Sequence, residues 1–206
     1  MAQALPASFY ARPVLEVARD LVGCVVRHGE GAGVIVETEA YHECEPACHA
    51  FGGPTPRAAV LFGAPGTAYV YRSYGIHALL NAVCEPAGTG AAVLIRALAP
   101  QTGISAMRAR RPVSYERELC NGPGKLSQAL GIGLEHNATS LVDGPVRIEA
   151  PAPAPDLPLV SGPRIGITRA TELPWRFCMA GSPYVSRPFP EGFGALTRRA
   201  ATPAAR

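Results

Sequence analysis

The segment Gly33-Val-Ile-Val-Glu-Thr-Glu-Ala40 has the composition of a β-strand with two glutamates built into it. β-Branched residues favour the extended backbone, and residues two apart lie on the same face of a strand. Glu37, Glu39 and Tyr41 are therefore expected on one face. The run 22–28 is a second strand pattern, and the Gly-rich residues between the two predict a β-hairpin. The alternation alone does not show which glutamate takes part in chemistry.

Similar patterns extend through the rest of the chain. Strands are expected at 67–72, 91–98, 145–149 and 164–168, and an apolar run covers 76–84. Helical spacing is found at 13–21, 105–111 and 124–130. Residues 151–158 are too rich in proline for strand pairing and are expected to form a surface loop, while the end of the chain from about residue 192 is expected to be frayed. Strands resume on both sides of 151–158, so we do not divide the chain there.

Length and composition limit the class of protein. The chain has 206 residues, of which 48% are apolar and 17% charged, enough for a substantial core in one large domain or two small ones. Its six cysteines are scattered and follow no secretory signal. No apolar stretch reaches the length of about 18 residues that a membrane helix needs. We therefore expect an intracellular protein with reduced thiols and no membrane partner.

The charged residues are unevenly distributed among types. Of the 19 basic residues Lys125 is the only lysine, and only three of the 16 acids are aspartates. A Schiff-base mechanism would have to use Lys125 or the N-terminal amine, and a metal cage of several aspartates is hardly available. Arginine is the preferred bidentate partner of phosphate, but a base-biased genome would give the same excess, so both explanations stay open. A net charge of +3 does not by itself indicate a nucleic acid.

One candidate site combines Glu39, as a general base, with Tyr41, Tyr71, Tyr74 and Arg96. Aromatic side chains stack on nucleobases, arginines hold phosphates, and an enzyme that acts on a base must draw it out of the helix. Judged on periodicity alone, however, tyrosines on one strand face are more often core residues or cross-strand pairs. Strand alternation alone therefore does not distinguish a base-binding site from a packed core.

Two other interpretations are weaker. The loop after the glutamate strand could ligate zinc through His42, Cys44, Cys48 and His49. These residues lack the paired CxxC spacing of common structural sites, so we expect no metal. The turns at 63–66 and 122–125 could cradle a phosphate, but neither has the Ser or Thr that completes a Walker motif. A GxSxG nucleophile elbow is also missing.

A series of short motifs runs through most of the chain, from Ala18 to Ser186. In order, they are Ala18-Arg-Asp-Leu-Val-Gly23, Ile35-Val-Glu-Thr-Glu-Ala-Tyr41, His49-Ala, Thr55-Pro-Arg57, Pro65-Gly-Thr-Ala-Tyr-Val-Tyr71, Tyr74-Gly75, Asn81, Leu94-Ile-Arg-Ala-Leu98, Met107-Arg108, Leu119-Cys-Asn-Gly-Pro-Gly-Lys-Leu126, Gln128-Ala-Leu130 and Gly181-Ser-Pro-Tyr-Val-Ser186. Each is weak alone, but the ordered series is highly specific. It resembles the alkyladenine (3-methyladenine) DNA glycosylase family.

The resemblance implies a monofunctional glycosylase that works without a cofactor. Such an enzyme flips alkylated or deaminated purines out of duplex DNA and hydrolyses the N-glycosidic bond, leaving an abasic site. 3-Methyladenine and 7-methylguanine are the implied bases, and hypoxanthine is left open. By position, Glu39 matches the catalytic glutamate that activates water, and Arg96 matches the arginine that helps to hold that water and the carboxylate. The motif Glu-Thr-Glu-Ala-Tyr thus selects the second glutamate.

The resemblance also implies a base pocket and a DNA surface. Tyr41, His49 and Tyr71 match the residues that sandwich the flipped base, and Asn81 matches the asparagine that screens purine substituents. Tyr74 matches the tyrosine that wedges into the duplex. The expected DNA-binding set is completed by Ile76 beside this wedge and by His77, Arg57, Arg108 and Lys125.

The loop between Tyr41 and His49 departs from the family pattern. It contains seven residues, one fewer than the family usually carries. His49 can still reach the pocket from this loop, and the shorter connection could widen or reshape it. We therefore expect a substrate range that differs from that of relatives.

The residue patterns and the resemblance together predict an α/β (α+β) fold. We expect residues 1–206 to form a single compact domain, ordered from about 8 to 190, with a curved, mostly antiparallel mixed sheet, open-barrel-like, and peripheral helices. The expected partner is double-stranded DNA containing damaged purines, bound by a monomer in the cytoplasm or, in a bacterium, at the nucleoid. The alternative is a non-catalytic damaged-DNA-binding module of the same fold, which would not need Glu39.

Overall fold

The computed structural model describes residues 3–150, 158–189 and 195–196. The helices are α1 (Ala7–Tyr10), α2 (Val14–Leu21), α3 (Ile104–Arg110) and α4 (Pro123–Leu130), with 3-10 turns η1 (Ala59–Phe62), η2 (Glu116–Glu118) and η3 (Leu134–His136). The strands are β1 (Val25–His28), β2 (Gly31–His42), β3 (Ala68–Ser73), β4 (His77–Val83), β5 (Ala91–Thr102), β6 (Val146–Glu149), β7 (Leu159–Gly162), β8 (Arg176–Met179) and β9 (Ala195–Leu196).

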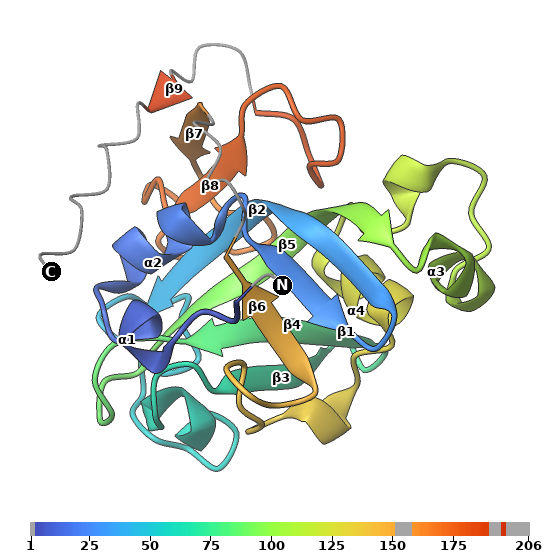
Figure 1. Cartoon of the computed structure of the whole chain (residues 1–206). Coiled ribbons are helices and arrows are strands. Elements are labelled where there is room, and N and C mark those ends of the chain that lie inside the picture. The colour runs from blue at the N-terminus through green and yellow to red at the C-terminus, as the bar shows by residue number, and fades with distance from the viewer. Residues whose placement is uncertain (1–2, 151–157, 190–194, 197–206) are drawn as a thin grey trace, which may run out of the picture.

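These strands form one curled sheet around the two long strands β2 and β5 (Figure 1). The strand order is β3-β4-β5-β2-β8-β7-β9, and β1 pairs with both β2 and β6. The predicted α+β class with a curved, open-barrel-like sheet is confirmed. Every pairing among the described strands is antiparallel, so in this part of the chain the sheet is antiparallel rather than mixed.

The helices cover the sheet from two sides. In Figure 1, α1 and α2 lie together on one side, and α3 and α4 lie on the opposite side. Helix α2 buries Val14, Val17, Ala18 and Leu21, whose spacing places them on one helical face. The Thr38 hydroxyl donates a 2.8 Å hydrogen bond to the Ala18 carbonyl. This contact fixes α2 against β2 between the two glutamates. No helix in the described residues is long and apolar enough to cross a membrane.

The register between β2 and β5 shifts where the polar residues lie. Ile35 pairs with Leu98 and Glu37 with Ala97, so Val36 is an extra residue on β2. Thr38 then pairs with Ile95, so Arg96 is an extra residue on β5. Bulges of this kind bend a strand and redirect its side chains, and they are common beside active sites. The irregular register brings Arg96 to Glu37 and to Glu39.

One expected strand is absent, and three strands of the structure, β7, β8 and β9, were not expected from the sequence. Residues 164–168 form a bent segment rather than a strand, with Gly166 at φ +77°. The edge of β2 that this segment would need pairs instead with β8, and the Ala40 amide donates to the Trp175 carbonyl. Strands β7, β8 and β9 had no recognisable pattern. Residues 151–157 of the loop expected at 151–158, and most of the expected frayed end, lie outside the described residues.

Candidate active site

Glu39 is fully buried, and its carboxylate receives hydrogen bonds from three directions. The Tyr41 hydroxyl donates to Oε2 at 2.8 Å, and the Ile165 amide donates to Oε1 at 2.7 Å. Arg96 Nη1 lies 3.3 Å from both carboxylate oxygens. Because the donors come from β2, β5 and the segment after β7, the carboxylate is held in one orientation.

Glu37 is also fully buried, but its hydrogen bonds join it to Arg176 and Ser186 as well as to Arg96. Its Oε1 accepts from Arg96 Nε at 3.0 Å and from Arg176 Nε at 2.7 Å. The Ser186 amide and hydroxyl donate to the same carboxylate at 2.6 and 2.8 Å. Glu37 therefore has two arginine partners, whereas Glu39 shares only Arg96.

Burial shifts the ionisation of Glu39. Desolvation raises the pKa of its carboxyl group above the ordinary value, and Glu37 adds to this effect. Arg96, the Ile165 amide and the Tyr41 hydroxyl oppose the rise without cancelling it. A carboxylate with a raised pKa is a stronger base than an ordinary glutamate, which suits it for accepting a proton.

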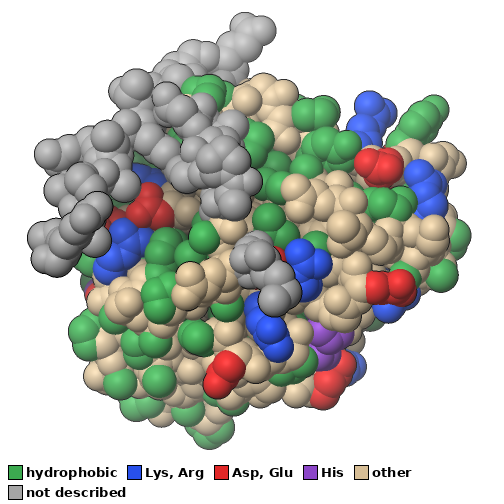
Figure 2. Space-filling model, in the orientation of Figure 1, with side chains coloured by type: hydrophobic (Ala, Val, Ile, Leu, Met, Phe, Trp, Pro, Cys, Tyr) green, Lys and Arg blue, Asp and Glu red, His purple; other side chains and the backbone are tan. Residues whose placement is uncertain are grey.

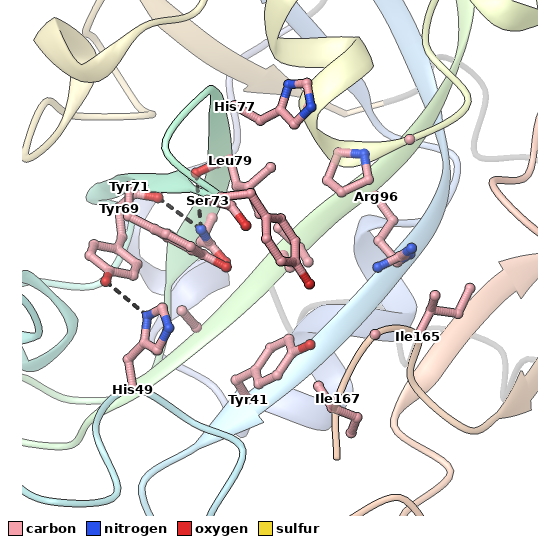
Figure 3. Close-up of a pocket in the computed structure, with 18 of the residues that line it drawn as sticks. Tyr41, His49, Tyr69, Tyr71, Ser73, His77, Leu79, Arg96, Ile165 and Ile167 are labelled. Carbon is pink, nitrogen blue, oxygen red and sulfur yellow. Dashed lines mark hydrogen bonds between the residues drawn. The ribbon is translucent and has the colours of Figure 1, made fainter. Parts of the chain in front are cut away.

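A cavity of about 610 Å³ lies beside this carboxylate and is lined by the donors Tyr41, Arg96 and Ile165. In Figure 3, His49, Tyr69 and Tyr71 lie at one end of the cavity, Arg96 and Ile165 at the other, and Tyr41 between them. The part lined by Tyr41, His49, Tyr69 and Tyr71 is called the aromatic end. The volume of the cavity lies in the range of sites for small molecules, and its walls combine apolar rings with a few polar groups.

His49 lines this cavity even though its loop is short. Its ring packs edge-on against Tyr71 with centroids 4.7 Å apart, and its Nδ1 lies 3.0 Å from the Tyr69 hydroxyl. The loop 42–50 is anchored by Glu45, which forms a bidentate ion pair with Arg164 at 2.7 and 2.9 Å. Although this loop is one residue shorter than the family usually carries, His49 still lines the cavity.

The amide of Asn81 is oriented by backbone groups on β3 and β4. Its Nδ2 donates to the Tyr69 carbonyl at 3.0 Å and to the Leu79 carbonyl at 3.2 Å. Both amide hydrogens are thereby used, and the Asn81 side chain lines the cavity. Its carbonyl oxygen is left as the group that can accept a hydrogen bond there.

The rim of the cavity carries exposed side chains from the β3–β4 turn and from the start of α4. Tyr74 is 89% exposed and has φ +48°, followed by Gly75 at φ +74°. Two successive positive φ values are characteristic of a type I′ hairpin turn, which projects Tyr74 outward. His77 and Lys125 share this rim, and Ile76 is 75% exposed beside it.

Two of the expected DNA-binding residues lie elsewhere. The Arg57 guanidinium packs over the Tyr71 ring, 5.2 Å from its centroid. Arg108 Nη1 donates to the Val113 carbonyl at 3.1 Å and is not among the residues that line the cavity. The structure thus brings Tyr74, His77 and Lys125 together but leaves Arg108 apart from them.

The residues considered as zinc ligands are dispersed. His42 Nδ1 accepts from the Cys44 amide, and His42 Nε2 lies 3.6 Å from Glu85. Cys48 is buried, and burial raises the pKa of its thiol to about 12. Within the residues that the structure describes, no three His, Cys, Asp or Glu side chains gather in a way that would hold a metal ion.

Comparisons of the amino-acid sequence with known proteins show the family of the chain. The model of the methylpurine-DNA glycosylase family matches residues 8–183. The chain belongs to this family. It is 57% identical over 187 residues to the "Putative 3-methyladenine DNA glycosylase" of Rhodopseudomonas palustris strain BisB18, covering 91% of this chain and 92% of the relative. A protein of the same name from Methanoculleus marisnigri is 50% identical over 189 residues, covering 89% and 98%. As a member of this family, the chain is a monofunctional DNA glycosylase of base excision repair.

Several residues at the site of this glycosylase were not predicted from its sequence. Tyr69, on the same strand face as Tyr71, could have been found from the alternation in 67–72. Arg164 and Ile165 could not, because only the three-dimensional fold brings them to Glu45 and Glu39. Arg111, which is not part of the expected DNA-binding set, lines the cavity together with Lys125.

Proposed function

We propose that this glycosylase removes alkylated purines, such as 3-methyladenine and 7-methylguanine, from duplex DNA. The damaged nucleotide turns out of the helix into the aromatic cavity, where its N-glycosidic bond is hydrolysed. The observation that carries the proposal is the position of Glu39. Its carboxylate is fixed by Tyr41, Arg96 and Ile165, which themselves line a cavity of about 610 Å³.

The aromatic end of the cavity suits a cationic purine. 3-Methyladenine and 7-methylguanine carry a positive charge while attached to the sugar, and the faces of Tyr41 and Tyr71 attract cations. A cation–π contact contributes about 0.5–2 kcal/mol, more when water is excluded. Normal bases lack this charge, so the pocket favours damaged ones. The same charge makes the purine a good leaving group.

In the proposed reaction, Glu39 accepts a proton from a water molecule as the water oxygen attacks C1′ of the sugar. The bond between C1′ and the purine nitrogen breaks, and its electron pair leaves with the base, which becomes neutral. The negative carboxylate also stabilises the positive charge that develops on the sugar. Arg96 holds the Glu39 carboxylate in place, while its own charge is balanced by Glu37.

The rim residues are proposed to hold the DNA. Tyr74 projects from its turn and would fill the gap that the flipped nucleotide leaves, compensating lost stacking of a few kcal/mol. Lys125, whose Nζ hydrogen bonds with Asn121 Oδ1 at 2.8 Å, would face a phosphate. As the only lysine is engaged at the rim, we expect the product to be an abasic site on an intact strand.

The test replaces Glu39 with glutamine, which keeps the shape but cannot accept the proton. Excision of 7-methylguanine from a duplex with one lesion should fall to background in Glu39→Gln, while binding to a duplex with an abasic-site analogue should persist. Glu172→Gln, on the exposed surface, is the matched control and should excise normally. Undiminished excision by Glu39→Gln would show that another residue is the base. Binding without any release by the unaltered protein would favour a non-catalytic module.

A further inference from the structure

Three side chains at the aromatic end of the cavity form a chain of contacts that the proposed reaction does not use. His49 Nδ1 lies 3.0 Å from the Tyr69 hydroxyl. The Arg57 guanidinium packs over Tyr71, whose ring is stacked on Tyr69 with centroids 5.3 Å apart. The positive charge of Arg57 also acts on the Tyr69 hydroxyl, where it opposes the rise in pKa that burial causes. A cation, a phenol and an imidazole are thus connected in series.

The charge of Arg57 favours one direction for the hydrogen bond between Tyr69 and His49. A nearby positive charge favours loss of the phenol proton, which makes the Tyr69 hydroxyl a better hydrogen-bond donor. The Tyr69 proton is then donated to His49 Nδ1. A neutral imidazole that accepts at Nδ1 carries its own proton on Nε2. Because the Nδ1 edge of the ring faces Tyr69, the Nε2 edge is the one available to the cavity, which His49 lines (Figure 3).

The same surroundings keep the ring uncharged. Burial lowers the pKa of His49, and the positive charge of Arg57 lowers it further. The other ionisable groups that the described residues place next to the ring are the neighbouring Cys48 thiol and the phenols of Tyr69 and Tyr71, which are neutral at pH 7. His49 is therefore neutral near pH 7, and a cationic purine meets no opposing charge from it.

We propose that Arg57 and Tyr69 act as positioning residues that hold His49 as a neutral imidazole with its proton on Nε2. In this state His49 is a fixed hydrogen-bond donor for a lone pair on the flipped base, a ring nitrogen or a carbonyl oxygen. Arg57 thus has a role in the base pocket rather than at the DNA backbone. The identity of the ligand rests on the proposed function, but the protonation state of His49 does not.

The protonation state can be measured on the free, folded protein. Long-range ¹H–¹⁵N NMR spectra at pH 7 should show His49 protonated at Nε2, with its signals assigned by their loss in His49→Gln. In Tyr69→Phe, which keeps the ring but removes the hydroxyl, the two tautomers should mix. Protonation at Nδ1 in the unaltered protein, or an unchanged tautomer in Tyr69→Phe, would overturn the proposal.

An NMR pH titration tests the part played by Arg57. The pKa of His49 should rise in Arg57→Gln and stay the same in Arg72→Gln, which removes another exposed arginine, on β3. An unchanged pKa in Arg57→Gln would show that Arg57 does not control the charge of His49. Backbone spectra identical to those of the unaltered protein would establish that each variant is folded.

Excision rates then test whether the charge of His49 affects binding of the damaged base. For 7-methylguanine, the rate at pH 6 relative to pH 8 should fall in Arg57→Gln, because an imidazolium repels the cationic purine. A ratio unchanged from that of the unaltered protein would overturn the role of His49 charge in binding. If the unaltered protein releases no purine at all, the proposed function fails, while the NMR results still decide the tautomer and the pKa.

Discussion

Two glutamates of the same strand differ in the charge around them. Glu37 contacts both Arg96 and Arg176, and its remaining bonds hold Ser186. Glu39 shares only Arg96, and its other donors are neutral. The difference between the two carboxylates therefore follows from their partners and not from the strand pattern that they share.

The raised pKa of Glu39 predicts how excision depends on pH. Burial raises the pKa of Glu39 above 4.5, so the carboxylate is lost by protonation at a higher pH than for an exposed glutamate. With 7-methylguanine, whose departure needs no proton, single-turnover excision should rise with pH through the raised pKa of Glu39 and then level off. Rates measured from pH 4 to 8 check this, and an acid limb with a midpoint at or below 4.5 would contradict it.

At the scale of elements, a buried ion pair joins two irregular segments at the site. Arg164 bonds to Glu45 in the loop 42–50 and to the Ala40 carbonyl at the end of β2. Its guanidinium also packs over the Tyr41 ring at 4.6 Å. The next residue, Ile165, donates to Glu39. One side chain therefore sets the position of the loop, of a pocket tyrosine and of the carboxylate.

Breaking this ion pair should lower both stability and activity. In Arg164→Met, the Glu45 carboxylate stays buried without its partner, which typically costs about 3–5 kcal/mol. Excision should fall as well, because Ile165 is no longer held against Glu39. The double variant Glu45→Gln, Arg164→Met should recover much of the stability but not the activity. Denaturant unfolding and single-turnover excision separate the two effects, and full activity in either variant would refute the positioning role.

The elements differ in how well sequence predicts them. Local alternation is enough for β2 and β3, and helical spacing that begins at or just after a proline is enough for α2 and α4, because these patterns arise within a few residues. The segment 164–168 was wrongly expected as a strand because its β-branched residues favour one. Its actual shape depends on Arg164 reaching Glu45, which is 119 residues away in the chain. The bulges at Val36 and Arg96 likewise depend on cross-strand register.

At the scale of the molecule, the distribution of charge is more informative than its sum. The net charge is only +3. Lys125, Arg111 and His77 nevertheless gather on one rim of the cavity, next to the exposed Tyr74. On the face seen in Figure 2, basic and acidic side chains are interspersed among apolar ones. A small total charge is therefore compatible with a local DNA-binding rim, whose contribution should be visible in salt dependence.

Each phosphate contact releases counterions, so affinity for duplex DNA falls with salt in proportion to the number of contacts. Replacing Lys125 with glutamine should reduce the slope of log affinity against log salt by about 1, and should weaken damaged and undamaged duplexes alike. Arg147→Gln, on β6 outside the cavity rim, removes one positive charge as well and should leave the slope unchanged. Fluorescence anisotropy at several salt concentrations measures both. Equal slopes for Lys125→Gln and the unaltered protein would mean that the DNA backbone does not lie at this rim. An equal decrease of the slope in Lys125→Gln and Arg147→Gln would show that overall charge, and not the rim, determines the salt dependence.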